Sequence, residues 1–498
     1  MPAQLTTRQQ VNGYRFLLRR LEHALMRRDV RMLHDPMRSH FRAVIVGVAL
    51  AVLVTGGAFV YGLIKPAGSV GDSKIIVTKD SGGLYVMIDD TLHPVLNLAS
   101  ARLIIGSAEK PSSVSESKLS GYKRGPLVGI PGAPQTLPGP KDENHSYWTV
   151  CDTVLEPTGS GSVAGGVSTT VLAAAPENPG AARELSANEG LLVQSNDKTY
   201  LLNGGKRFLV DTKDPAVERA FDLDGATVRP VSAGMLNAFP EADELTTPDI
   251  EDRGKSSKTG LGAVGSVIEV AGVGDSGATL YVVLENGVQK VTQAAADVIR
   301  YSDDAGGGQV DTVAPAAITD AAQVHDLAVD DFPAVAPKIV EQRRDPVGCL
   351  AWDRGTGEGE AARLRILAGT GLPLDEGKAP VELATSDSSG SGLDGAYIPP
   401  STGAYLATTG SDPESPRRES LMFVNDAGVR FEVADADTGK ALGLGDKPHV
   451  APWPIVGLLP AGPRLSQHDA LVERDSVMMA GGTGSDVQVG EGATNTEG

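Results

Sequence analysis

The longest apolar run in the chain covers Ala43 to Ile64, 22 residues without a charged side chain. A helix of about 20 apolar residues spans a bilayer core of about 30 Å. The alternative is a cleaved signal peptide, but such a peptide has a short basic start and an apolar core of about 7–15 residues. Here 42 patterned residues precede a run of full membrane length. We therefore predict a transmembrane helix that anchors the chain.

Before this run, apolar residues recur at helical spacing through residues 6–31, and Thr6 with Gln9 fits a capping box at the start. The apolar positions are Val11, Tyr14, Leu17 or Leu18, Leu21 and Leu25. The arginines between and around them are Arg15, Arg19, Arg20, Arg27 and Arg28. The pattern predicts a basic amphipathic arm that either lies on anionic lipid or docks its apolar face on a cytoplasmic partner.

Beyond the membrane run, one pattern occurs four times: an aromatic-bearing strand, a turn rich in Asp, Asn or Gly, and a second apolar strand. This order is typical of a β-hairpin. The four copies cover residues 84–95, 199–210, 280–291 and 422–433. Stretches such as 98–103 and 294–300 then read as short helices. Four hairpins at irregular intervals indicate a repeated module with insertions.

Further β-like runs lie between the modules, at 146–150, 162–174 and 364–367, and those flanking Cys151 and Cys349 predict a central sheet domain. The fold class is therefore α+β and β-rich, with four hairpin-plus-helix repeats around a central β-domain. The polar stretch 241–265 reads as a loop or linker. The end of the chain lacks the apolar content to pack and is predicted to be disordered.

The expected domain limits are 1–42 for the arm, 43–64 for the transmembrane helix, 65–110 for the first repeat, 111–185 and 346–400 for the halves of the central domain, 186–245 for the second repeat, 246–345 for a linker and the third repeat, 401–476 for the fourth repeat, and 477–498 for the tail.

Charge divides sharply at the membrane run. The first 42 residues hold nine arginines and three acids, a net +6, whereas the residues after the run hold 35 basic and 60 acidic side chains, a net −25. Basic residues next to a span favour the cytoplasmic side, so we expect a cytoplasmic N-terminus, a single pass through the membrane and an exported remainder. An acidic exported region also argues against nucleic-acid binding, because it repels phosphates.

Two cysteines, Cys151 and Cys349, are the only ones in the chain, and both follow the membrane run. An even pair in an oxidising compartment predicts one disulfide. The alternative is two buried free thiols, which we weigh as the weaker interpretation.

Two short stretches resemble phosphate-binding motifs but lack the flanking residues and elements that such motifs require. Gly254, Lys255 and Ser256 match the end of a P-loop, but position 249, where the first glycine belongs, is an aspartate. Residues 260–265, GLGAVG, match a dinucleotide fingerprint, yet a strand-like run follows where a helix is required. No metalloprotease, paired-cysteine or serine-hydrolase motif occurs, so we assign no catalytic residue, cofactor or metal.

Longer stretches of sequence resemble the EccB family, the single-span core component of actinobacterial type VII (ESX) secretion machines. The stretches that carry this resemblance are QVNGYRFLLRRLEHALMRRD from Gln10, LHPVLNLASARLIIG from Leu92, RGPLVGIPGAP from Arg124, WTVCDT from Trp148, DPVGCLAW from Asp345, APWPIVGLLPAGPRLS from Ala451 and DALVERD from Asp469.

The resemblance implies a periplasmic region of four repeats around a central β-rich domain, with a disulfide at Cys151 and Cys349. It also implies a membrane complex with EccC, EccD and EccE subunits, with EccB copies paired as dimers within a hexamer around the pore. Family members are sometimes labelled ATPases, although in the family the motor with P-loops is EccC. Likeness of the repeats to a phage lysin subunit points to peptidoglycan as a further partner, by analogy of fold.

Three functions therefore compete: a structural component of a secretion complex, an autonomous hydrolase of nucleotide or cell wall, and a cell-wall-binding anchor. A hydrolase or a wall binder needs an anchor but no patterned cytoplasmic arm of 42 residues. The arm favours the first function.

Overall fold

The structure is a computed structural model that describes residues 7–28, 36–64, 73–139, 145–156, 166–176, 180–272, 277–302, 310–357 and 359–476. The chain divides into two compact units. One comprises Met1–Asp72, Thr78–Ser81 and Ser112–Gly121, and the other Ser73–Val77, Gly82–Pro111 and Tyr122–Gly498. The tail 477–498 lies outside the described residues, so its expected disorder stays a prediction.

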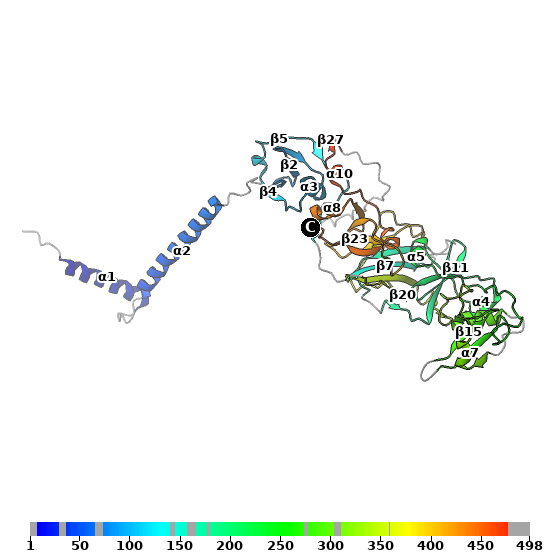
Figure 1. Cartoon of the computed structure of the whole chain (residues 1–498). Helices are drawn as coiled ribbons and strands as arrows, with labels where there is room; N and C mark the ends of the chain where they lie inside the picture. The colour runs from blue at the N-terminus through cyan, green and yellow to red at the C-terminus, as the bar shows by residue number, and fades with distance from the viewer. Residues whose placement is uncertain are drawn as a thin grey trace, which may run out of the picture. The chain divides into compact units, whose positions relative to one another are not determined.

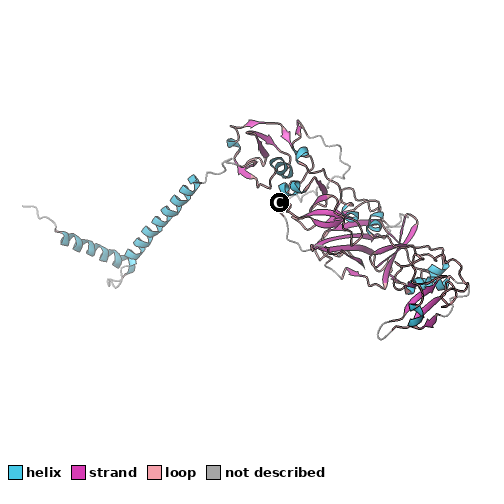
Figure 2. Cartoon of the chain, viewed as in Figure 1, coloured by secondary structure: helices cyan, strands magenta, loops and turns pink. Residues whose placement is uncertain are grey.

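The first unit contains two long helices, α1 (Arg8–Arg27) and α2 (Pro36–Ile64) (Figures 1 and 2). It also contains β4 (Ser112–Val114) and a 3-10 helix at Glu116–Lys118. The N-cap of α1 is Thr7, whose backbone N–H donates to Gln10 Oε1 at 3.0 Å. The expected cap at Thr6 is therefore wrong by one residue, because the repeated Thr and Gln of TTRQQ fit a capping box in either register.

In the second unit, a seven-stranded sheet has the strand order β21-β22-β8-β7-β19-β20-β9. Its strands are β7 (His145–Val154), β8 (Val167–Leu172), β9 (Ala182–Glu184), β19 (Val347–Gly355), β20 (Arg363–Gly369), β21 (Val381–Glu382) and β22 (Gly395–Tyr397). Three strands come from before the second and third repeats and four from after them. The expected central β-domain, assembled from two distant segments, is confirmed.

The middle of this sheet is buried on both faces. Strands β7 and β19 pair antiparallel over nine residues, with Trp148 directly opposite Trp352 and both 2% exposed. Such strands read as near-continuous apolar runs rather than alternating ones, which is why WTVC and CLAW carry almost no polar side chains.

Around the sheet lie four repeats, each built on a meander of three antiparallel strands followed by a short helix. The first has β1 (Ile75–Thr78), β2 (Leu84–Ile88), β3 (Thr91–Pro94) and α3 (Leu98–Ile105). The second has β10 (Glu189–Ser195), β11 (Lys198–Asn203), β12 (Lys206–Leu209) and α4 (Pro215–Ala220). The third has β14 (Val267–Val270), β15 (Thr279–Val283), β16 (Val288–Val291) and α6 (Gln293–Tyr301). The fourth has β23 (Gly403–Thr409), β24 (Leu421–Asn425), β25 (Arg430–Val433) and α8 (Ala436–Leu442).

The module is larger than the expected hairpin plus helix. In repeats two to four, a strand after the helix returns parallel to the first strand of the meander. These returning strands are β13 (Arg229–Pro230), β17 (Asp311–Val313) and β26 (His449–Pro452), and the helices that follow them are α5 (Ala233–Ala238), α7 (Pro315–Thr319) and α9 (Trp453–Val456). The hairpins are confirmed as the middle and last strands of each meander.

A polar residue begins the helix of every repeat. The side chains of Asn97, Asp214, Thr292 and Asp435 each accept a backbone N–H from the first turn of α3, α4, α6 and α8. An N-cap of this kind stabilises a helix by about 1 kcal/mol. The same cap chemistry in all four copies fixes where the chain turns from strand to helix.

The segment after the first repeat departs from the expected limits. Strand β5 (Lys123–Arg124) pairs with β3, and β6 (Leu127–Val128) pairs with β27 (Glu473–Arg474), which follows α10 (Gln467–Ala470). Residues 123–128 therefore lie with the first repeat and not in the central domain, whose expected start at 111 is too early. The other limits stay predictions.

Within the second unit, three hydrophobic clusters show which parts pack together. One joins the central sheet to the second and fourth repeats, for example Trp352 with Met235 and Ile455. Another joins the second repeat to the third. The remaining one joins the first repeat to the fourth, for example Val86 with Phe431. The strand β18 (Lys338–Ile339) adds to the second repeat by pairing with β10.

Candidate assembly surfaces and buried polar sites

The apolar stripe of the arm is uncovered in the part of α1 that the structure describes. Its exposed residues are Val11, Tyr14, Leu18, Leu21 and Leu25. The most exposed of the five is Leu25, at 74%. Because a contiguous apolar surface on a helix is costly in water, docking through this stripe stays the prediction for the arm. Phe16 and Met26 are exposed as well, and the sequence interpretation did not name them.

The expected basic residues lie on the same helix. Arg19, Arg20 and Arg28 are exposed, whereas the side chain of Arg27 lies outside the described residues. The backbone of Arg28 turns left-handed, with φ of 55°, and its N–H donates to the Ala24 carbonyl, which ends the helix.

Helix α2 contains one segment, His40–Val60, that is long and apolar enough to cross a membrane, with a mean hydropathy of 2.5. None of that segment is buried in the structure. The hydroxyl of Thr55 donates to the Ala51 carbonyl at 2.6 Å, so this polar group is satisfied within its own helix. The expected transmembrane helix therefore corresponds to the apolar part of α2.

In the central sheet, Cys151 on β7 and Cys349 on β19 are directly opposite and form a disulfide with an S–S distance of 2.07 Å. Both sulfurs belong to fully buried residues, packed with Leu172, Leu367 and Tyr397. The predicted disulfide is thus present, between the two longest of the described strands. The bond closes the sheet across the insertion that carries the second and third repeats.

Next to the disulfide, Asp152 is 2% exposed and lies between the sheet and the second repeat. Its carboxylate accepts the Ser232 N–H at 2.6 Å, the Ser232 hydroxyl at 3.0 Å and the Thr169 hydroxyl at 2.9 Å. Burial raises the pKa of Asp152 to about 6, against the opposing effect of these hydrogen bonds. Ser232 also caps α5, so this carboxylate holds the start of that helix on the sheet.

A second buried carboxylate continues the network. Asp394 accepts the Thr169 N–H at 2.8 Å, together with the N–H groups of Asp387 and Ser388. Its negative charge is a further, smaller cause of the raised pKa of Asp152. The sequence interpretation missed both residues, although a lone acid in the otherwise apolar strand WTVCDTV was a visible signal.

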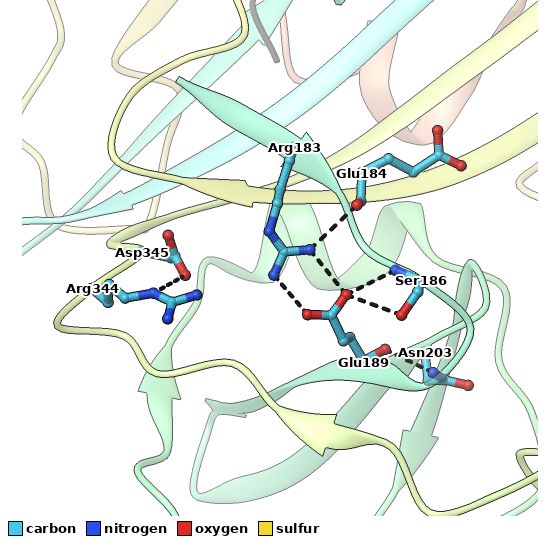
Figure 3. Close-up of polar contacts among 7 residues, drawn as sticks. All are labelled: Arg183, Glu184, Ser186, Glu189, Asn203, Arg344 and Asp345. Carbon is cyan, nitrogen blue, oxygen red and sulfur yellow. Dashed lines mark hydrogen bonds and ion pairs between the residues drawn. The ribbon is translucent and has the colours of Figure 1, made fainter. Parts of the chain in front are cut away.

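Figure 3 shows a polar cluster where β9, the last strand of the sheet, leads into the second repeat. Arg183 binds Glu189 through two parallel contacts of 2.9 and 2.6 Å, and Glu189 also accepts the N–H and hydroxyl of Ser186. These contacts lower the pKa of Glu189 to about 2, with the hydrogen bond from Arg183 as the largest cause. The side chain of Asn203 donates to the backbone carbonyl of Glu189 at 2.9 Å. The cluster fixes the turn between sheet and repeat.

The near-match to a P-loop cannot cradle a phosphate as it stands. The N–H of Gly254 donates to the Val264 carbonyl at 2.9 Å and the N–H of Lys255 to the Asp252 carbonyl at 3.1 Å, so neither is free. The Lys255 amine is 2.6 Å from Asp252 Oδ1, and this contact raises the pKa of Lys255. After Ser256 comes the expected strand, β14, and not the helix that a P-loop requires.

Among the described residues, no group of three His, Cys, Asp or Glu side chains is placed to hold a metal ion. The strongly shifted carboxyl groups, Asp152 and Glu189, are bound to residues of neighbouring elements. Their geometry fits structural roles at the joins between sheet and repeat.

Comparison with known proteins covers almost the whole chain. Residues 3–479 match the family model described as "Type VII secretion system ESX-1, transport TM domain B". The protein named ESX-5 secretion system ATPase EccB5 of Mycobacterium tuberculosis is 37% identical over 484 residues, 95% of each chain. ESX-3 secretion system ATPase EccB3 of Mycolicibacterium smegmatis is 37% identical over 488 residues, 95% of this chain and 91% of that protein.

Two solved structures resemble the fold closely. A chain in the structure of an intact ESX-5 inner membrane complex aligns with a TM-score of 0.72 and 34% identity, over 98% of this chain and 99% of that one. The EccB3 dimer from the ESX-3 core complex aligns with a TM-score of 0.67 and 32% identity, over 80% and 100%. With the anchored arm, the four repeats and the disulfide-bonded central sheet, these matches show that the chain belongs to the EccB family of type VII secretion systems.

Proposed function

We propose that this protein is a structural core component of a type VII secretion complex in the inner membrane, where it links the two sides of the membrane and stabilises the assembly around the pore. The observation that supports this most is the correspondence of 98% of the chain to a subunit of an intact ESX-5 inner membrane complex. That correspondence takes in the arm and α2, which a free-standing periplasmic protein does not need.

Our proposal includes an orientation and a set of partners. The net +6 before the membrane helix supports a cytoplasmic arm and a periplasmic sheet and repeats. The uncovered stripe of α1 supports docking on another subunit, and EccC, EccD and EccE type subunits are the partners that the family resemblance implies. The solved EccB3 dimer supports pairing of the periplasmic regions, with such dimers arranged within a hexamer.

We do not extend the proposal to nucleotide hydrolysis, although the names of the relatives include the word ATPase. In this chain the one stretch resembling a phosphate loop has its backbone donors and its lysine occupied. We assign the nucleotide hydrolysis that drives secretion to the EccC type subunit instead, whose P-loops the resemblance implies.

Affinity purification from solubilised membranes tests the proposed function. A tag placed after Ser476 keeps the arm free, and native gels followed by mass spectrometry identify what is retained. We expect a large complex that contains an ATPase subunit and several copies of this chain. Recovery of a monomer alone, under conditions that keep other membrane complexes intact, would overturn the proposal.

Peptidoglycan contact through the repeats stays a prediction of the resemblance. Co-sedimentation of the protein with purified sacculi, compared with sacculi digested by lysozyme, is its direct test.

A further inference from the structure

A cleft of about 1110 Å³ lies within the second unit, between the ends of the central strands and the fourth repeat. The cationic residues that line it are Arg354, Lys378, Arg418 and Lys447. Asp446 is the acidic residue among the lining residues, so the lining carries a net +3 with histidines neutral. In a chain of net charge −19, a cleft of the opposite sign indicates an anionic ligand.

Two guanidinium groups in this cleft have no acidic partner in the part of the chain that the structure describes. Arg354, at the end of β19, is 7% exposed, and among the described residues its guanidinium has no hydrogen bond and no ion pair. Within the described ranges, Arg418 donates only to the backbone carbonyls of Ser415 and Arg417. Burial and then the charge of Arg354 lower the pKa of Arg418, so the two groups repel one another. Arg354 is a buried cation without a counter-charge among the described residues, which is costly, and a bound carboxylate would relieve that cost, whereas Arg418 is exposed and open to a ligand.

The nearby acids do not supply this counter-charge. Asp375 is paired with Lys378 at 3.0 Å, and the Glu360 carboxylate lies over Gly355 and Gly357. Neither forms an ion pair with Arg354 or Arg418 in the described part of the chain. The two guanidinium groups are therefore available to an external anion, which a guanidinium can bind through two parallel hydrogen bonds.

The side chains and loop backbone that line the cleft favour a polypeptide ligand over a sugar polymer. Trp148, Tyr397, Tyr405 and Phe423 line the cleft but are at most 7% exposed. The more open rings among the lining residues include the partly exposed Tyr147 and the exposed His145, and these two already stack on one another at 5.7 Å. The rim loops 356–357 and 445–447, by contrast, have backbone N–H groups that donate to no other described residue. A peptide main chain offers the carbonyl oxygens that such donors need.

We propose that this cleft binds an acidic polypeptide segment, with carboxylates on Arg354 and Arg418 and its main chain along the rim. A site of this kind goes beyond the role in the assembly and does not depend on the docking of the arm. Its occupant is a segment with at least two spaced acidic side chains on the same side of the membrane as the sheet.

The test uses the full chain in lipid nanodiscs and the fluorescence anisotropy of labelled hexaglutamate. Hexaglutamine is the uncharged control, and hexagalacturonate distinguishes an acidic glycan. Arg418→Gln and Arg354→Gln remove one guanidinium each, and Arg464→Gln is the matched control because Arg464 is an exposed arginine of the fourth repeat that is already paired with Glu432. Thermal unfolding checks that the buried Arg354→Gln variant remains folded.

We expect hexaglutamate to bind and hexaglutamine not to bind, with affinity falling as salt rises. Arg418→Gln and Arg354→Gln should each weaken binding about tenfold, and Arg464→Gln should leave it unchanged. Equal binding of hexaglutamine, no effect of Arg418→Gln, or tighter binding of hexagalacturonate would each overturn the proposal. Because the assay needs no other subunit, its failure would not bear on membership of the complex.

Discussion

Cys151 and Cys349 face one another across the two central strands with 4.0 Å between their Cα atoms, although 198 residues separate them in the sequence. The chain between them builds the second and third repeats and then returns to the same sheet. The disulfide therefore ties together the two distant segments of the central domain that flank the insertion.

Loss of this bond should strongly destabilise the central domain. In the chain-entropy model, closing a loop of this length contributes about 5 kcal/mol, so the double variant Cys151→Ala, Cys349→Ala should lose stability of that order. Denaturant unfolding of the variant, beside the reduced wild-type protein, measures it. Thiol labelling of the unfolded, unreduced protein should find no free cysteine, and two labelled thiols would contradict the assignment.

Asp152 should make the protein more stable in mild acid than at neutral pH. Its pKa is about 6 in the fold against an ordinary 3.8, so between pH 4 and pH 6 the folded state binds more protons than the unfolded state. The free energy of unfolding contributed by this group therefore falls as pH rises through that window, by up to about 3 kcal/mol. Unfolding curves at pH 5 and pH 7 measure the difference.

Asp152→Asn is the matched variant for this effect. Its amide oxygen still accepts the Ser232 N–H, and its amide nitrogen can donate to the hydroxyls of Ser232 and Thr169. We expect the variant to be more stable than wild type at pH 7 and to lose most of the pH dependence between 4 and 6. If the stability of the variant depends on pH as that of the wild type does, Asp152 is not the cause of the pH dependence.

Sequence patterns identified the hairpins because their turns carry residues suited to positive φ. Asp89 and Asp90, and Gly204 and Gly205, adopt φ between 44° and 79°, as two-residue hairpin turns require. The first strands of the second and fourth meanders were missed, although Asn196 and Asp197 form one further turn of this kind between β10 and β11. In the fourth repeat a long connection between β23 and β24 replaces such a turn, so no local signal marks the first strand.

Sequence patterns did not identify the partners of the buried carboxylates Asp152 and Asp394 for a different reason. Asp152 meets Ser232 and Thr169 from 80 and 17 residues away, and Asp394 meets Thr169 from 225 residues away. The pairing of β8 with β7 and β22, together with the placement of α5 against the sheet through Ser232, brings them together. Composition identified the two cysteines as a pair, because no other partner existed for either, whereas the many acids gave no basis for choosing these two.

The Arg183–Glu189 pair should contribute modestly to stability. Because Arg183 is 40% exposed, solvent screening limits the contribution of this bidentate pair to about 1 kcal/mol, and Glu189→Gln should cost that amount at pH 7. The pKa of Glu189 is about 2 in the fold, so its contribution is present above pH 4.5 and is lost as pH falls towards 2. Lys440→Gln, which breaks an exposed pair with Asp437, should change stability far less.

Purified protein should neither bind nor hydrolyse nucleotide through the stretch around Lys255. Isothermal titration with magnesium ATP and a phosphate-release assay measure this directly, beside the Lys255→Ala variant. Lys255 is exposed and pairs with Asp252, so its loss should leave the fold intact. Hydrolysis by the wild type that disappears in Lys255→Ala would reverse our interpretation of this stretch.

The arm makes the sharpest prediction about assembly, because lipid binding and subunit docking depend on different residues of α1. Docking through the stripe predicts that Leu18→Ser with Leu21→Ser releases the protein from its complex, while α2 alone keeps it in the membrane. Lipid binding predicts instead that the arginines dominate, each contributing on the order of 1 kcal/mol near an anionic surface. In that case, neutralising Arg19, Arg20, Arg27 and Arg28 should reduce recovery of the complex more than the two leucine substitutions do.

We expect the variant without Leu18 and Leu21 to be lost from the purified complex. The association of the arginine variant with the complex should be weakened less, although removing positive charge can also disturb the orientation of the chain in the membrane. Phe16→Ser is the matched control, because Phe16 is 56% exposed and at 100° per residue lies on the opposite side of α1 from Leu18 and Leu21. It removes a similar apolar surface without touching the stripe, so its complex should form normally. A complex that survives the loss of both leucines would show that the arm is not the docking element.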